Sequence, residues 1–428
     1  MSDTITLQNS KESLVCGECL RNVPGKRSIY KGKYQEQEVI IKVFFGKINA
    51  KRRMHRELAG IKELDKRKIT TPLLLFSGKT LQGNWCIITK YISFAENASD
   101  LWTQSPTIES KKQILQKIIA VLAEHHRQKI QQMDLHIGNF LISENDVFTL
   151  DPAQIKFQYF TVSRAACLKN LAILAAQYSE ISPYYFLKVY ARCRQWSIDC
   201  TLKKNFCRET TRISRKRIKK ILRKYLRKNT RHYEVVEKNL HAIVDKTLCE
   251  YDEIIDFINK ISQVDKEIFY YNKQQVSVTR FSNKSQALKN WCNSHHLQLL
   301  NFEHPTPLAY VKTHNYSYVV SEHISYEKFY NYLENSKVED KIRTTVVRKA
   351  IKFLDIISQK KIIHQDIYNN LVANDEAVFF SNVENIIFYN EDMFTQIYQS
   401  FYKQICRSKY FYFFEREQHA ENNKGIHS

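Results

Sequence analysis

The segment Ile130–Phe157 reads IQQMDLHIGNFLISENDVFTLDPAQIKF. It places Asp134 five residues before Asn139, and it places a second acid, Asp151, directly after the strand-like run VFTL. One loop and one strand end therefore hold two carboxylates and a carboxamide. A later segment, Ile362–Phe388, repeats this layout without its last acid.

The residues before this segment predict a small sheet with one helix. RSIYKGKY (27–34) and EVIIKVFF (38–45) are typical of strands joined by a short polar turn. Residues 49–68 have helical spacing through Met54, Leu58 and Ile61. Lys42 ends the run VIIK on a strand, and Glu57 lies on the helix that follows. Helical segments follow Asp151, so the order favours an α+β fold.

These side chains are the ones that phosphoryl transfer from ATP requires. A carboxylate accepts the proton of the acceptor hydroxyl, an Asn and a second carboxylate hold Mg²⁺, and a Lys steadied by a Glu holds phosphate oxygens. The first half of the chain offers all five in the expected order. Each residue alone is more typical of a turn, a cap or a solvated ion pair. The series together favours a kinase.

The motifs DLHIGN and LDPA resemble the catalytic and metal-binding loops of the eukaryotic-like kinase superfamily. With VIIKVF, HRELAGIKEL, TPLLL and the basic tract RKRIKKILRKYLRKNTR, residues 20–235 look most like bacterial lipopolysaccharide core kinases of the Kdo/WaaP type. The resemblance implies a bilobal, protein-kinase-like fold. It also implies ATP as phosphate donor and a sugar of the lipopolysaccharide inner core as acceptor.

The resemblance assigns roles by position. Asp134 would be the catalytic base, and Asn139 and Asp151 would bind Mg²⁺. Lys42 would hold the α- and β-phosphates, and Glu57 would hold Lys42.

The rest of the expected nucleotide site is less typical of the family. Adenine would lie against the backbone of Lys90, Tyr91 and Ile92. The turn that covers the phosphates offers few glycines, and Gly25 is the expected one. Position 132, where His is common in the family, is Gln.

The same order of motifs recurs in the second half, which predicts a duplication. Pro72 and Pro307 are 235 residues apart, Asp134 and Asp366 are 232 apart, and Asp151 and Asn382 are 231 apart. We place the boundary between residues 1–260 and 261–428.

The second copy is expected to be degenerate. Asn382 replaces the metal-binding acid, and Asn370 follows Asp366 by four residues instead of five. Arg280 stands at or next to the Lys position, and no acid lies between Glu267 and Glu303 to partner it. This copy is predicted to support the first domain or to hold a partner, with residual nucleotide binding less favoured.

The chain is strongly basic. Its formal net charge is +22, and the tract Lys203–Arg231 carries fourteen Lys and Arg against one acid. Ile218, Ile221 and Leu222 fall on one helical stripe of this tract. Three interpretations remain open. The tract packs as a solvated helix, docks on an anionic membrane or lipopolysaccharide surface, or, least favoured, binds nucleic acid.

Composition gives the remaining expectations. The 428 residues exceed one typical domain. Ten cysteines without a regular framework suit a reducing cytoplasm, and no segment has the apolar length of a signal core or a membrane span. We therefore expect a cytoplasmic protein, and the resemblance to lipopolysaccharide kinases implies a peripheral position at the inner membrane. Two alternatives stay open: a protein kinase, such as an effector, and a non-catalytic scaffold with two kinase-like folds.

Overall fold

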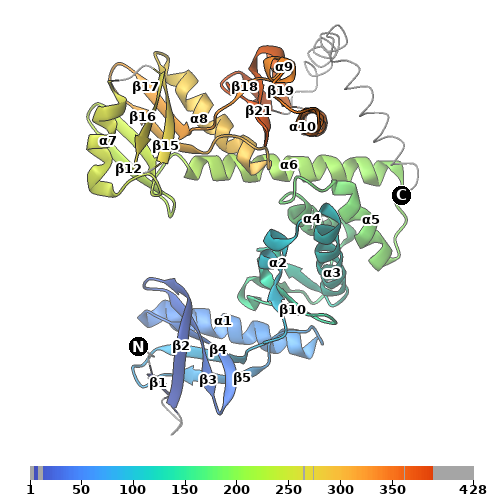
Figure 1. The fold of residues 1–428 in the computed structure, drawn as a ribbon. Helices are drawn as coiled ribbons and strands as arrows, with labels where there is room; N and C mark the ends of the chain where they lie inside the picture. The colour runs from blue at the N-terminus through green and yellow to red at the C-terminus, as the bar shows by residue number, and fades with distance from the viewer. Residues whose placement is uncertain (1–3, 8–12, 264–265, 273, 361, 389–428) are drawn as a thin grey trace. The chain divides into compact units, whose positions relative to one another are not determined.

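The computed structural model describes residues 4–7, 13–263, 266–272, 274–360 and 362–388 (Figure 1). The chain divides into two compact units, Met1–Arg215 and Lys216–Ser428. The division falls within α6 (Cys200–Lys224), not near residue 260 as the sequence suggested. The reason is a long-range pairing: β13 (Leu240–Asp245) joins β12 (His232–Glu237) to β16 (Pro307–Lys312) in one sheet. Residues 232–245 therefore belong to the second unit.

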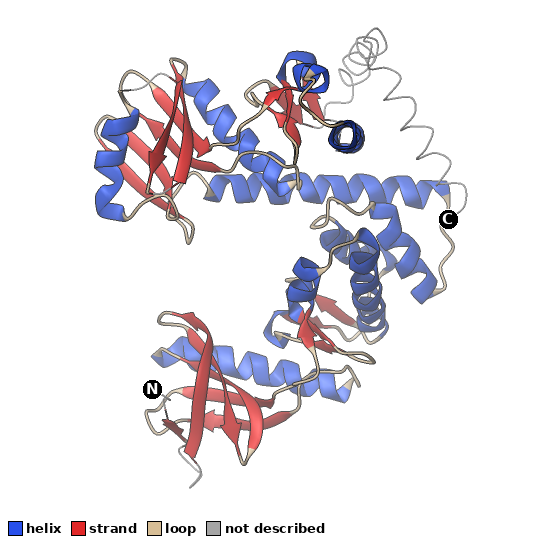
Figure 2. Ribbon diagram, viewed as in Figure 1, coloured by secondary structure: helices blue, strands red, loops and turns tan. Residues whose placement is uncertain are grey.

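The first unit begins with an antiparallel sheet in the order β1-β2-β3-β4-β6-β5. Its strands are β1 (Thr4–Thr6), β2 (Ser13–Val23), β3 (Arg27–Tyr34), β4 (Gln37–Phe44), β5 (Leu74–Lys79) and β6 (Trp85–Lys90). Val39, Ile41 and Val43 of β4 are buried in one core cluster. Because side chains alternate along a strand, Lys42 points to the opposite face, which α1 covers (Figure 2).

Helix α1 spans Lys47–Lys66 and confirms the helical spacing of the sequence. Ala50, Met54 and Ile61 bury one face of it against Phe44 of β4 and Ile87 of β6. Glu57 lies on the same buried face. The face that holds the helix on the sheet is therefore also the face that carries an acid toward Lys42.

The remainder of the first unit is mainly helical and closes around one large apolar core. Two small sheets lie in it, in the orders β10-β9-β7 and β11-β8. Its elements are β7 (Glu96–Asn97), α2 (Ala98–Gln104), α3 (Ile108–Arg127), β8 (Ile130–Gln132), η1 (Ile137–Asn139), β9 (Phe140–Ile142), β10 (Val147–Thr149), η2 (Pro152–Gln154), β11 (Ile155–Phe157), α4 (Arg164–Ala175) and α5 (Pro183–Arg194). The mixed content confirms the α+β class.

Two buried histidines at the end of α3 tie this core to the loop segments. His125 bonds the Thr149 hydroxyl at 3.1 Å through Nε2. His126 bonds the Tyr190 hydroxyl at 2.7 Å and Asn170 Oδ1 at 3.1 Å. Burial lowers the pKa of His125 to about 3 and that of His126 to about 4. Both imidazoles are therefore neutral at physiological pH.

Mild acid is expected to destabilise the first unit. Below about pH 6.5 the histidines of the unfolded chain become protonated, whereas those of the folded protein stay neutral. The free energy of unfolding therefore falls as the pH drops from about 6.5 toward 4. At pH 5 each histidine costs about 2 kcal/mol. Denaturant unfolding of wild type and His125→Gln between pH 7.5 and 5 measures this. The variant should lose less stability over that interval, and an identical pH dependence in both proteins would contradict the assignment.

After the end of α6, the second unit contains β12, β13, η3 (Tyr251–Glu253) and α7 (Ile254–Ile261). The unit includes a six-stranded sheet in the order β12-β13-β16-β17-β15-β14. Its other elements are β14 (Lys266–Tyr271), β15 (Gln274–Phe281), α8 (Lys284–Leu299), β17 (Ser317–Glu322), β18 (Glu327–Lys328), α9 (Phe329–Glu334), α10 (Asp340–Lys360), β19 (Ile362–His364), α11 (Ile367–Asn370), β20 (Leu371–Ala373), β21 (Val378–Phe380) and β22 (Ile386–Phe388).

The order of strands in this unit parallels the first. The series β14-β15-β17-β16 has the same sequential pattern as β3-β4-β6-β5, with a helix after the second strand in each. The small sheets β21-β20-β18 and β22-β19 likewise parallel β10-β9-β7 and β11-β8. The hairpin β12-β13 extends the sheet beyond β16. Among the described strands of the first unit, none lies beyond β5, the strand that corresponds to β16 in this order.

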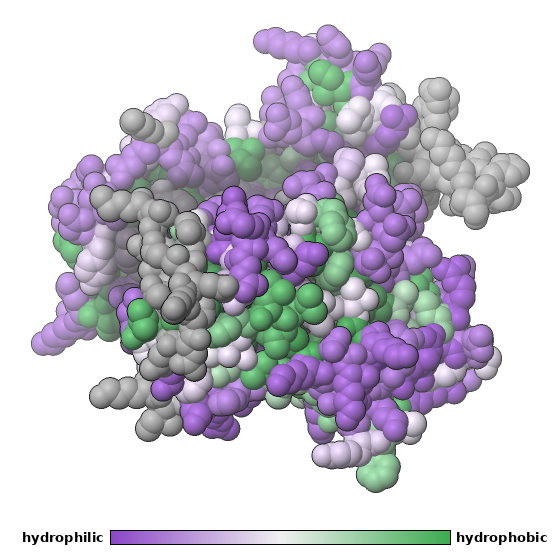
Figure 3. All heavy atoms as spheres, turned by 90° about the horizontal axis from the view of Figure 1, so that it is seen from below, coloured by the Kyte–Doolittle hydropathy of each residue, from purple (hydrophilic) through white to green (hydrophobic). Residues whose placement is uncertain are grey.

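Helix α6 carries most of the basic tract. Phe206 is buried in the core of the first unit, and Ile218 is buried in a core of the second. All fourteen Lys and Arg of the tract are exposed. Hydrophilic side chains also cover much of the face drawn in Figure 3. Within the described residues, no helix combines the length and apolarity that a membrane crossing needs. The aromatic segment KYFYFFER (409–416), which the sequence leaves open as a membrane-interface segment or a core strand, lies outside the described residues.

Candidate active site

Three charged side chains from separate elements meet in the first unit. The Lys42 ammonium on β4 donates to Glu57 Oε1 on α1 and, at 3.2 Å, to Asp151 Oδ1 after β10. Arg27 on β3 lies 4.0 Å from the other oxygen of Asp151. The side chains of Lys42 and Glu57 are 16% and 3% exposed, whereas that of Asp151 is 31% exposed. We call Lys42, Glu57 and Asp151 the ion cluster.

Electrostatics keep Lys42 and Asp151 charged. Burial acts to lower the pKa of Lys42, but the carboxylates of Glu57 and Asp151 outweigh it and raise that pKa above its ordinary value. Burial acts to raise the pKa of Asp151, but Lys42 and Arg27 outweigh it and lower that pKa. Lys42 is therefore a fixed cation and Asp151 a fixed anion at neutral pH.

The backbone of the loop that carries Asp134 is held by hydrogen bonds on its buried side, while the Asp134 carboxylate faces solvent. Asn139 is buried and donates from Nδ2 to the backbone oxygen of Asp134 at 2.7 Å. The backbone N–H of Leu150 donates to Asn139 O at 2.8 Å, which connects this loop to the strand before Asp151. The Asp134 side chain is 70% exposed, with His136 Nε2 4.0 Å from its Oδ2. Asp134 is placed to meet a group arriving from outside.

Two amides that the sequence did not single out also hold this loop. Asn170 of α4 donates to the backbone oxygen of Gln132 at 2.8 Å. Gln177 donates to the backbone oxygen of Leu135 at 2.7 Å. The Gln132 side chain itself is buried, and neither of its polar atoms has a partner among the described residues. No motif marked Asn170 or Gln177, because their role depends on packing between distant segments.

Asp151 lies in a tight turn against α1. Its backbone has φ of +47°, a left-handed conformation that costs energy for a residue with a side chain. Gly60 of α1 approaches the next residue so closely that a Cβ there would come within 2.7 Å of both Pro152 Cβ and Pro152 O. The absence of a side chain at Gly60 thus sets the distance between α1 and the turn. No motif in the sequence indicates this role for Gly60.

The other residues expected at the nucleotide site lie in the turn between β2 and β3 and at the end of β6. Gly25 lies in the turn between β2 and β3, with φ of +68°. Lys90 ends β6, and Tyr91 and Ile92 follow it. The backbone N–H of Lys90 donates to Leu73 O, and that of Tyr91 donates to Glu38 O. These two donors are used within the sheet, so they are not available to adenine in this arrangement.

The five candidate residues lie within a segment that matches a known family. Residues 20–160 match the lipopolysaccharide kinase (Kdo/WaaP) family. The resemblance seen in the sequence is thus confirmed for this third of the chain. No curated protein matches the chain. Among the solved structures that match is WbdD with the kinase inhibitor LY294002, at 12% sequence identity and a TM-score of 0.34. That match covers 46% of this chain and about half, 51%, of the WbdD chain.

Kinases of the lipopolysaccharide kinase family normally use ATP, typically with Mg²⁺. The side chains at this site offer oxygen donors for such a cation. The Asp151 carboxylate and the Asn139 side-chain oxygen are the hard oxygen donors that Mg²⁺ prefers. The Asn139 amide nitrogen is already committed to Asp134 O, which leaves its oxygen for a cation. No cluster of three or more His, Cys, Asp or Glu suited to a metal occurs in the described part of the chain. Two protein donors fit a Mg²⁺ ion that also binds phosphates.

In the second unit the corresponding loop keeps its frame. Asn370 donates from Nδ2 to the backbone oxygen of Asp366 at 2.8 Å, and Ser381 N–H donates to Asn370 O at 2.9 Å. These bonds parallel those of Asn139, although the loop is one residue shorter. The Asp366 carboxylate instead accepts from Asn369 at 3.0 and 3.1 Å. The hydrogen bonds that hold the backbone of this loop are thus present, although the Asp366 carboxylate is engaged by Asn369.

The strand register of the second unit identifies the counterpart of Lys42. Lys42 pairs with Ile87 of β6, and Thr279 pairs with Val319 of β17. Val319 and Ile87 are each the third residue of their strand. The Lys position is therefore held by Thr279, whereas Arg280 is its neighbour and lies over the Tyr316 ring at 4.4 Å. A shift of one residue places a side chain on the opposite face of a sheet.

Proposed function

We propose that the first unit is an ATP-dependent phosphotransferase of the lipopolysaccharide kinase type. The observation that carries the proposal is the ion cluster, which brings Lys42, Glu57 and Asp151 together from three separate elements inside the family-matching segment. A structural ion pair would not need the third member. Convergence of two carboxylates on one buried Lys, beside a loop with an exposed Asp, fits the needs of phosphoryl transfer.

Each residue has a task in this proposal. Lys42 pairs with phosphate oxygens of ATP, and Glu57 holds its ammonium in place. Asp134 accepts the proton of the acceptor hydroxyl, which is why its exposure matters. Asn139 and Asp151 would hold Mg²⁺, which when bound neutralises negative charge on the phosphates.

The proposed acceptor is a sugar hydroxyl of the lipopolysaccharide inner core, presented at the cytoplasmic face of the inner membrane. The family match supports this acceptor class. The exposed cations of Lys203–Arg231 support an anionic lipid surface as the place where the acceptor is met. Each Lys or Arg near anionic lipid contributes on the order of 1 kcal/mol.

Membrane association can be tested apart from catalysis. The full chain should sediment with vesicles containing anionic lipid at low salt and be released near 0.5 M salt, because screening weakens exposed charges. Neutral vesicles serve as the control. Binding that is equal on neutral and anionic vesicles would contradict the role given to the basic tract.

We further infer that the second unit is a duplicated, catalytically inactive kinase-like domain. The parallel strand order supports the duplication. The positions of Lys42 and Asp151 are taken by Thr279 and Asn382, which supports the loss of activity.

The central experiment is transfer of labelled phosphate from ATP with Mg²⁺. Purified protein is given lipopolysaccharide from a strain that lacks this gene, and separately a protein lysate. Label in the glycolipid supports the proposed acceptor. Label only in protein would favour a protein kinase instead. No transfer together with no ATP-dependent rise in melting temperature would favour a scaffold without catalysis.

Gly60→Ala is expected to reduce transfer strongly although alanine favours helices. The new Cβ would lie 2.7 Å from Pro152, so α1 must move and Glu57 moves with it. A displacement near 1 Å at a catalytic group costs about a hundredfold in rate. Intrinsic propensity would instead stabilise the helix by about 1 kcal/mol. Lys62→Ala, an exposed change on the same helix, is the control, and equal activity of both variants would refute the packing argument.

A further inference from the structure

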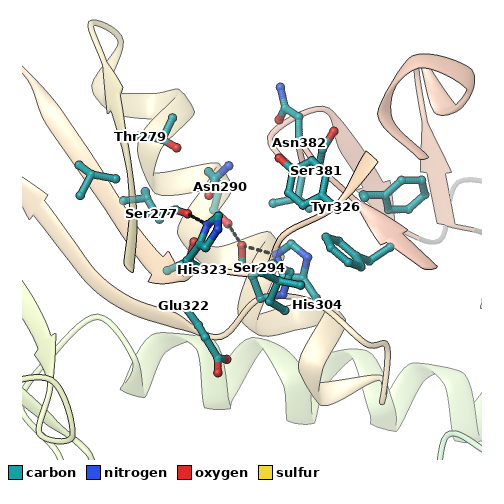
Figure 4. Close-up of a pocket in the computed structure, with 18 of the residues that line it drawn as sticks. Ser277, Thr279, Asn290, Ser294, His304, Glu322, His323, Tyr326, Ser381 and Asn382 are labelled. Carbon is teal, nitrogen blue, oxygen red and sulfur yellow. Dashed lines mark hydrogen bonds between the residues drawn. The ribbon is translucent and has the colours of Figure 1, made fainter. Parts of the chain in front are cut away.

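The second unit contains a cavity of about 540 Å³, a size typical of small-molecule sites. One side is formed by β15, β17 and α8, and the other by the end of β21 and the residues after it (Figure 4). The whole cavity lies within one unit. Its polar lining includes Ser277, Thr279, Asn290, Ser294, His304, Ser321, His323, Ser381 and Asn382.

The cavity occupies the place that the ion cluster occupies in the first unit. Thr279 has the strand register of Lys42. Ser294 follows Thr279 at the fifteen-residue separation that joins Glu57 to Lys42. Asn382 follows β21 as Asp151 follows β10. The three positions that hold charged residues in the first unit thus hold neutral and mostly shorter residues here. The cavity lies where the longer side chains would be.

The lining is unsuited to phosphate. Among the described residues that line the cavity there is no Lys or Arg, and the single carboxylate among them is on Glu322. That carboxylate is directed away from the group of hydroxyls and imidazoles in Figure 4. A triphosphate carries several negative charges, and sites for it use cations or a metal to neutralise them. With Asn in place of the metal-binding Asp, neither is supplied.

The polar groups suit an uncharged ligand. His323 Nδ1 and the Ser277 hydroxyl bond each other at 2.9 Å. His304 Nε2 and the Ser294 hydroxyl bond at 3.1 Å, while the buried Nδ1 of His304 has no partner among the described residues. Burial lowers the pKa of His304 to about 4, so its ring is neutral.

The walls are apolar on both sides of these groups. Val319 of the sheet, the strand partner of Thr279, lines the cavity and is 4% exposed. On the opposite side, Phe379 packs edge-on against the exposed ring of Tyr326, with centroids 5.4 Å apart. A flat heterocycle fits between aliphatic and aromatic walls, and a hydroxyl-bearing sugar fits the Ser and Asn groups.

We propose that this cavity binds a nucleoside, that is, a planar base with a ribose and no phosphate. The inference rests on the proposed function in one respect: the cavity corresponds to the proposed nucleotide site of the first unit. The cavity is expected to prefer a nucleoside over a nucleotide because Thr279, Ser294 and Asn382 are neutral. With these residues in place of an ion cluster, the cavity attracts neither phosphate nor Mg²⁺.

The test is calorimetric titration of the full chain with adenosine, guanosine, cytidine and uridine. A saturating non-hydrolysable ATP analogue with Mg²⁺ is present to occupy the first unit. We expect one nucleoside site per chain that remains under these conditions. Thr279→Trp fills the cavity from β15 and should weaken binding at least tenfold. Val236→Trp, on exposed β12 outside the cavity, is the matched control and should bind as wild type.

The outcomes are distinct for the two units. Absence of nucleoside binding, or binding unchanged by Thr279→Trp, would overturn the inference. Displacement of the nucleoside by the ATP analogue at this site would overturn it as well. If Thr279→Trp fails to fold, Tyr326→Ala at the exposed aromatic wall replaces it, with a several-fold loss expected. Loss of ATP transfer in the first unit would leave this nucleoside titration unaffected, so the two proposals fail separately.

Discussion

Replacing Asp134 by Asn is expected to reduce phosphate transfer by at least about a hundredfold while ATP binding is retained. A positioned base contributes about 10²–10⁴-fold to rate, and Asn cannot accept the proton. Asp134 lies outside the ion cluster, and its carboxylate is largely solvent-exposed. The fold should therefore tolerate the change. Initial rates with labelled ATP, with ATP affinity from thermal shift, measure both quantities.

Asp146→Asn is the matched control for this prediction. Asp146 is an exposed acid in the hairpin between β9 and β10, close in sequence to the same loop. It should transfer phosphate at the wild-type rate. Unchanged activity in Asp134→Asn, under conditions where wild type is active, would remove Asp134 from the mechanism.

Replacing Lys42 by Met is expected to abolish transfer and also to destabilise the first unit. The Glu57 carboxylate is almost fully buried, and without Lys42 it loses the cation that it bonds. Breaking a buried ion pair from one side typically costs about 3–5 kcal/mol in the free energy of unfolding. Denaturant unfolding and the transfer assay measure the two effects independently.

A double variant separates these effects. Lys42→Met with Glu57→Gln removes the unpaired buried charge, so it should recover most of the lost stability. It should not recover transfer, because no cation faces the phosphates. If the double variant were active, the ion cluster would be structural only and the proposed mechanism would fail.

The order of Lys42, Glu57, Asp134, Asn139 and Asp151 predicted that these residues converge, and the structure brings Lys42, Glu57 and Asp151 into contact. The sequence placed Lys42 on a strand and Glu57 on the helix that follows. The structure confirms both elements, as β4 and α1, and joins the two side chains in an ion pair. Local patterns are informative here because each residue lies on an element whose type is fixed by nearby residues.

Features that depend on distant contacts were not predictable. The domain boundary was wrong because β13 pairs with β16 across more than sixty residues, and no Pro or Gly linker marks the true division. The counterpart of Lys42 in the second half was uncertain by one residue, which only the register with β17 resolves. The role of Gly60 follows from its approach to Pro152, which lies on a different element.

The neutral set at Thr279, Ser294 and Asn382 has a consequence for how this chain can change. Lys at 279 alone would place a cation in the cavity without a carboxylate at 294 or 382 to pair with it, and an acid at 294 or 382 alone would place an anion there without the Lys. Each single reversion is therefore expected to harm the protein before it could help. On the proposed duplication, the route back to a charged site would pass through less stable intermediates, so the loss of the ion cluster in this half would be difficult to reverse by single substitutions.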